Sequence, residues 1–119
     1  MDWKLDDDRP IWLQLSQQLT RRIITGVYPP GSKLPSVREL AAEAGVNPNT
    51  MQRALAQLEQ EGLAWADRTA GRLVTQNTAV LEAARLRAAQ AVIQGYFEDM
   101  SALGYPRKRA AELIKEEFS

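Results

Sequence analysis

The chain has 119 residues, of which 45% are hydrophobic and 25% charged, and its 15 basic and 15 acidic side chains cancel. This length supports one compact domain with a short appendage, and the composition is that of a folded globular protein. Cysteine and histidine are both absent. Their absence excludes disulfides, histidine-based metal sites and the usual nucleophile–histidine pairs of enzymes. We therefore expect no cofactor, no metal site and no catalytic residue.

The first residues are acidic. Asp6, Asp7 and Asp8 lie close to the start, and no basic segment followed by an apolar one accompanies them. A secretory signal requires such a pair of segments. The sequence therefore predicts a cytoplasmic protein that does not associate with membranes, with the acidic run as a solvated arm.

An amphipathic helix is predicted over residues 10–25, with Pro10 in its first turn and Gly26 just after its end. Its apolar side chains recur at helical spacing and should be buried: Ile11, Trp12, Leu15, Leu19, Ile23 and Val27. Residues 28–32 contain two prolines and a glycine, so a stiff loop follows.

Two short helices come next. Ser36 and Glu39 form a Ser-x-x-Glu capping box, and Gly45 suits the left-handed residue that ends the first of these helices. Asn47 and Pro48 are a good N-cap and first residue for the second, which ends at Gly62. The two buried faces consist of Val37, Leu40, Ala41 and Ala44 in the first helix and of Met51, Ala54, Leu55 and Leu58 in the second.

A β-hairpin is predicted after these helices. Its strands are residues 63–67 and 72–75, and residues 68–71 form the turn. Trp65 is expected to pack in the core on the inner face of the hairpin. Two helices followed by a hairpin are the order of elements in a winged helix-turn-helix.

Residues 76–119 form a separate helical tail in this interpretation, and residues 1–75 form the winged domain. A long helix from Thr78 carries an apolar stripe that is too wide for a one-sided surface helix, and its predicted dimerisation residues are Leu81, Ala84, Ala88, Val92, Tyr96 and Met100. After the break at residues 104–106, a last helix runs to about residue 118, with Leu113, Ile114 and Phe118 expected to be buried. The stripe predicts a two-fold dimer.

The steep crossing of two short helices lets the second enter a DNA major groove. Its outward face carries Asn49, Thr50, Gln52 and Arg53, which are side chains that can hydrogen-bond to base edges. A plain helical hairpin with a solvated polar face would show the same pattern. The hairpin that follows favours the DNA-binding interpretation, because arginines flank its tip where a wing would meet phosphate.

The sequence also resembles the GntR family of bacterial regulators over residues 10–75. The resemblance rests on residues 30–41 (Pro-Gly-Ser-Lys-Leu-Pro-Ser-Val-Arg-Glu-Leu-Ala), on residues 46–55, and on the Leu58-Glu59 and Glu61-Gly62-Leu63 runs. The remainder resembles the YtrA-like subfamily, whose members dimerise through a pair of helices. The predicted DNA-binding residues are Lys33, Ser36, Arg38, Asn47, Asn49, Thr50, Gln52, Arg53, Arg68, Gly71 and Arg72.

The sequence departs from the family pattern at two places. Pro48 stands where the family often has arginine, and the wing sequence Arg68-Thr69-Ala70-Gly71 keeps only the second glycine of the common Arg-Gly-x-Gly. We therefore expect one recognition-helix contact to be absent or replaced, and the wing to enter the minor groove differently.

The resulting hypothesis is a homodimeric repressor that occludes a promoter by binding double-stranded DNA at a pseudo-palindromic operator. The subfamily resemblance implies a transporter operon as its target. An alternative is a winged-helix module that binds another protein, which the zero net charge favours because DNA-binding domains are usually basic. The sequence leaves a small-molecule effector open and gives an enzyme no support.

Overall fold

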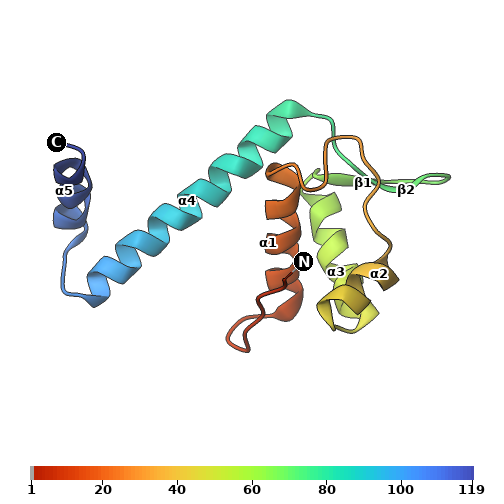
Figure 1. Cartoon of the computed structure of the whole chain (residues 1–119), viewed down its shortest axis with the longest axis horizontal. Helices are drawn as coiled ribbons and strands as arrows, with labels where there is room; N and C mark the ends of the chain where they lie inside the picture. Colours follow the sequence, from red (N-terminus) through yellow and green to blue (C-terminus); the bar gives the residue numbers. More distant parts are fainter. Residues whose placement is uncertain (1) are drawn as a thin grey trace. The chain divides into compact units, whose positions relative to one another are not determined.

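The computed structural model describes residues 2–119. Five helices and one two-stranded antiparallel sheet follow one another in the order α1 (Ile11–Ile24), α2 (Val37–Ala44), α3 (Pro48–Gln60), β1 (Ala64–Asp67), β2 (Gly71–Val74), α4 (Thr78–Ala102) and α5 (Arg107–Glu117) (Figure 1). The predicted winged helix-turn-helix with two further helices is confirmed. The chain divides into two compact units, one ending at Ala84 and the other comprising Arg85–Ser119, and each is described by itself.

The core of the first unit is a helical cluster centred on α3, which packs against both α1 and α2. Its fully buried side chains come from all three helices: Leu15, Leu19, Leu40, Met51, Ala54, Leu55 and Leu58. These are the apolar positions at helical spacing, so burial of one face of each helix explains why the three segments pack together.

The ends of α2 and α3 are fixed by local hydrogen bonds. The Ser36 hydroxyl accepts from the backbone N–H of Glu39 at 3.1 Å, and Gly45 ends α2 with φ +70°. The Asn47 side chain accepts from the backbone N–H of Asn49 at 2.7 Å. The capping box is only half formed, because the Glu39 carboxylate makes no return bond to the Ser36 amide among the described residues.

The hairpin is held at its base by the loop that precedes α2. The backbone N–H of Leu34 donates to the Arg72 carbonyl at 2.9 Å. Val74 donates to the Ser32 carbonyl at 2.9 Å and accepts from Gly31 at 3.0 Å. The loop therefore pairs with β2 through an isolated antiparallel bridge between Lys33 and Leu73, outside the two-stranded sheet, and it fixes the base of the wing to the helical core.

Asp67 organises the turn at the hairpin tip. Its Oδ1 accepts from the backbone N–H groups of Thr69 and Ala70, at 2.8 and 2.9 Å, and from the Thr69 hydroxyl. These bonds, with Ala70 contributing most, lower the pKa of the Asp67 carboxyl. The carboxylate therefore stabilises the turn fully at a pH above the pKa of Asp67 in the unfolded chain. This stabilisation is lost as the pH falls through the lowered pKa of the folded protein.

The N-terminal arm is not a free tail, although Asp6, Asp7 and Asp8 are exposed as expected. The Gln14 side chain is 1% exposed, donates to the carbonyls of Asp6 and Arg9 at 2.8 Å each, and accepts from the Asp6 N–H at 2.9 Å. The Gln14 side chain of α1 thus forms hydrogen bonds with the backbone groups of the arm, as a neighbouring strand would in a sheet.

A second contact ties the arm to α2. The buried Arg22 guanidinium lies 4.0 Å from the centre of the Trp3 ring and donates to Glu43 at 3.2 Å and to the Tyr28 hydroxyl at 3.0 Å. The Trp3 indole N–H donates to the same Glu43 oxygen at 3.1 Å. Because Arg22 belongs to α1 and Glu43 to α2, this cluster connects two helices that otherwise pack mainly through α3.

Several side chains predicted to be buried are exposed. Trp65 is 50% exposed, because it pairs with Leu73 on the hairpin face opposite the one that Ala64 and Val74 bury. Of the three tail residues expected to be buried, Leu113 is half-buried, whereas Ile114 of α5 and Phe118, which follows the end of α5, are 41% and 88% exposed. Val27, which lies beyond the end of α1, is also exposed.

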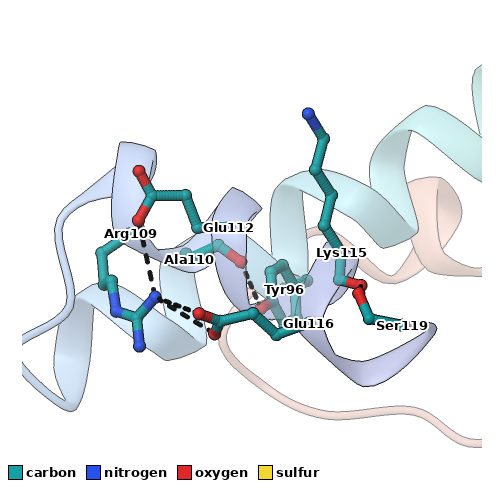
Figure 2. Close-up of polar contacts among 7 residues, drawn as sticks. All are labelled: Tyr96, Arg109, Ala110, Glu112, Lys115, Glu116 and Ser119. Atoms are coloured by element: carbon teal, nitrogen blue, oxygen red, sulfur yellow. Dashed lines mark hydrogen bonds and ion pairs between the residues drawn. The ribbon is translucent and has the colours of Figure 1, made fainter.

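The second unit joins the later part of α4 to α5. The Tyr96 hydroxyl donates to the Ala110 carbonyl at 2.7 Å, and the Arg109 guanidinium bonds to Glu116 at 3.1 Å and to Glu112 at 3.5 Å within α5 (Figure 2). A shallow, mainly apolar groove of about 380 Å³ is lined by Tyr96, Leu113, Ile114, Glu117 and Phe118. No helix among residues 2–119 is long and apolar enough to cross a membrane.

The arm contacts predict a measurable change in Gln14→Leu. This substitution introduces an apolar side chain of similar size and removes all three bonds to the arm. We expect a loss of about 1 kcal/mol of unfolding free energy, with faster hydrogen exchange at the Asp6 amide measured by NMR. The control is Gln60→Leu, at an exposed position of α3 outside the arm. Unchanged Asp6 exchange in Gln14→Leu would contradict the assignment.

Candidate nucleic-acid interface

The first turns of α3 present a polar surface. Asn49, Gln52 and Arg53 are exposed, Thr50 is half-buried, and the opposite face of the helix is in the core. The cap places Asn47 directly before the helix, and Pro48 occupies its first turn. The N-terminus of α3 therefore offers hydrogen-bonding side chains on one side, whereas the backbone N–H groups of its first turn are already bonded to Asn47.

Arg38 of α2 is exposed, and its guanidinium has no hydrogen-bond or ion-pair partner among residues 2–119. A long cation without an intramolecular partner is available to an external anion. Ser36, immediately before this helix, is exposed but uses its hydroxyl as the cap. Lys33 in the preceding loop is exposed as well.

Arg53 is not free in the same way. Its guanidinium lies 4.2 Å from the centre of the Trp12 ring on α1, within the range of a cation–π contact. Trp12 was expected to pack in the core and is half-buried. Helical periodicity could not reveal this pair, because its members belong to separate helices.

The hairpin carries three of the predicted residues. Arg68 is exposed at the tip, whereas Arg72 forms an ion pair with Glu59 of α3, with 2.6 Å between Nε and Oε1. Gly71 has φ +90°, and an added Cβ would lie 3.1 Å from Cε of Lys33. The glycine thus permits both the backbone turn and the close approach of the Lys33 side chain.

The predicted dimerisation residues divide between the two units. Leu81 and Ala84 are already buried in the first unit, so they are not open to a partner in the single chain. Val92 is 61% exposed. Ala88, Tyr96 and Met100 are half-buried.

Three comparisons agree with this arrangement. The family model for bacterial regulatory proteins of the gntR family matches residues 12–74. The HTH-type transcriptional regulator YhcF of Bacillus subtilis is 32% identical over 115 residues, which are 97% of this chain and 95% of that protein. The HTH-type transcriptional repressor YtrA of Bacillus subtilis is 43% identical over 68 residues, 57% of this chain and 52% of that protein.

A solved structure shares the whole fold. The GntR family transcriptional regulator from Listeria monocytogenes is 34% identical, with a TM-score of 0.79 over 94% of this chain and 98% of that one. The family match, the near full-length relative and the polar face of α3 lead to the same conclusion. The chain belongs to the gntR family of bacterial regulatory proteins and is a DNA-binding transcriptional regulator with a winged helix-turn-helix.

Proposed function

We propose that the chain is a homodimeric, cytoplasmic repressor that occludes a promoter by placing two copies of α3 on a pseudo-palindromic operator. The observation that carries this proposal is the exposed Arg38 of α2, which has no partner among residues 2–119, together with the polar N-terminal face of α3, the next helix. Occlusion requires tight binding and no chemistry, in keeping with a chain that lacks cysteine and histidine. The similarity to a protein named as a repressor supports the direction of regulation.

In this proposal, α3 lies in the major groove. Asn49 and Gln52 suit adenine, and Arg53 suits guanine, provided that its guanidinium extends from Trp12. Arg38 contacts a base or a phosphate. Phosphates are held by the remaining residues of this surface, namely Lys33, Ser36, Asn47 and Thr50.

The wing supplies a second region of contact. Arg68 at the exposed tip meets phosphate or the minor groove, and Gly71 lets Lys33 lie against the hairpin beside it. Thr69 stands in place of the family's first glycine, and the Asp67 bonds to Thr69 and Ala70 define the shape of the tip.

The second unit provides the dimer contact. Its exposed apolar side chains would be costly to leave in water, and a second copy of the same surface can cover them in a two-fold interface. They are Leu86, Val92, Ile93, Leu103, Ile114 and Phe118. A two-fold dimer spaces its half-sites by roughly 34–36 Å or a multiple of this distance. The subfamily resemblance suggests a transporter operon beside the chain's own gene as the target.

The Arg38 contact is tested by Arg38→Ala. We expect a loss of about 1–3 kcal/mol in specific affinity with little change in melting temperature, because the side chain is exposed. The probe is the duplex that the full chain selects from a random-sequence pool, titrated by fluorescence anisotropy. Arg21→Ala, on the exposed side of α1, is the charge-matched control. Failure of the full chain to select any duplex would favour the protein-binding alternative.

The Gly71 contact is tested by Gly71→Ala against Gly26→Ala. Both glycines have positive φ, so both substitutions should cost roughly 1–2 kcal/mol of stability. Only at Gly71 would the new methyl group meet Lys33, whereas Gly26 has open space. We expect weaker DNA binding in Gly71→Ala alone, and equal affinities in the two variants would remove Lys33 and Gly71 from the interface.

The dimer contact is tested by Val92→Asp, which places a charge in the proposed interface. We expect light scattering to report a mass near the 13.3 kDa of one chain, and footprinting to show poor protection of paired half-sites. Gln90→Asp adds the same charge at an exposed polar position of α4 and should remain dimeric. A dimeric Val92→Asp protein would place the interface elsewhere.

A further inference from the structure

We propose that Arg72 is a positioning residue of the wing: its ion pair with Glu59 fixes the hairpin against α3, and Arg68 supplies the cation that meets DNA. This inference rests on the proposed function, since it divides two wing arginines of similar sequence context into different roles. Both were predicted to contact DNA, because both flank the turn.

The first observation is the geometry of the pair. Arg72 Nε lies 2.6 Å from Glu59 Oε1, and the two side chains are only 17% and 33% exposed. A charge-assisted hydrogen bond this short, partly shielded from water, is stronger than a surface ion pair. The backbone carbonyl of Arg72 also accepts from Leu34, so the side chain of Arg72 is bonded to α3 and its backbone to the loop before α2.

The second observation is how little else fixes the outer part of the hairpin. Ala64 and Val74 bury the base of the hairpin, but Ala66, Arg68 and Thr69 are exposed. Among residues 2–119, the Glu59–Arg72 pair is the one side-chain hydrogen bond that joins α3 to the hairpin. Beyond the buried base, the pair therefore restrains the outer part of the hairpin against α3.

The third observation is electrostatic. For Arg72 to contact a phosphate, it would have to leave Glu59, and the uncovered carboxylate would then face the same anionic backbone. Arg68 can contact a phosphate without breaking an ion pair, because it is exposed and has no partner among the described residues. The neighbouring Asp67 carboxylate is occupied by the turn.

The two roles predict opposite signs for one substitution. If Arg72 is a positioning residue that stays paired with Glu59, Glu59→Gln loosens the wing and weakens specific binding. If Arg72 is a phosphate contact, Glu59→Gln frees it, removes a repulsive charge and tightens binding. The salt dependence gives a second criterion, because each phosphate contact contributes about 0.9 to the slope of log affinity against log salt.

The experiment compares the full-length chain with Glu59→Gln, Arg72→Gln, the double variant and Arg68→Gln, using the duplex selected from a random-sequence pool. We expect Glu59→Gln and Arg72→Gln each to weaken binding roughly two- to fivefold, since a pair biases an orientation by no more than its own free energy. The double variant should be no weaker than either single variant, and all three should keep the wild-type salt slope. Arg68→Gln should lower that slope by about 0.9.

Tighter binding by Glu59→Gln, or a slope lowered by about 0.9 in Arg72→Gln, would overturn the inference. Unchanged affinity in both single variants would overturn it as well. Arg72→Lys guards against a general folding defect, because the retained charge can still reach Glu59 and should restore part of the affinity. The proposed function fails separately, if Arg38→Ala and Arg68→Gln both bind as the wild type does.

Discussion

One face of α3 has to pack against two other helices, and the first unit is arranged around that requirement. Met51, Ala54, Leu55 and Leu58 are all fully buried between α1 and α2. Once they are committed to the core, the other side of the helix must face water and is polar. The face available for DNA is thus a consequence of how the core is packed, and α1, α2 and the hairpin all take their places from α3.

In this neutral chain, some basic side chains are paired with acidic ones inside the protein, and others are left available to DNA. Arg22 is paired with Glu43, and Arg72 with Glu59, each joining two elements of the first unit. Arg38, Arg68 and Lys33 have no acidic partner among the described residues and are exposed. Zero net charge is therefore compatible with DNA binding, because the local arrangement determines which cations reach a phosphate.

Features governed by neighbours in sequence could be predicted. The Asn47 cap and the left-handed Gly45 depend on residues a few positions apart, and both were correct. Contacts between distant segments could not be predicted, because nothing in the neighbouring sequence indicates that Gln14 binds the arm or that Arg53 lies over Trp12. Trp65 was wrongly placed in the core, because alternation along a strand shows that two faces differ but not which one is covered.

The salt dependence of specific binding by the full chain shows most directly whether the locally placed cations of this neutral chain contact DNA phosphate. We predict that log affinity for the selected duplex falls steeply and linearly with log salt. The slope depends on local phosphate contacts and not on net charge, and each contact contributes about 0.9. Several contacts, from Arg38, Lys33 and Arg68, should be visible in that slope. An affinity that does not change between low and physiological salt would contradict this prediction and indicate that this surface binds something other than DNA.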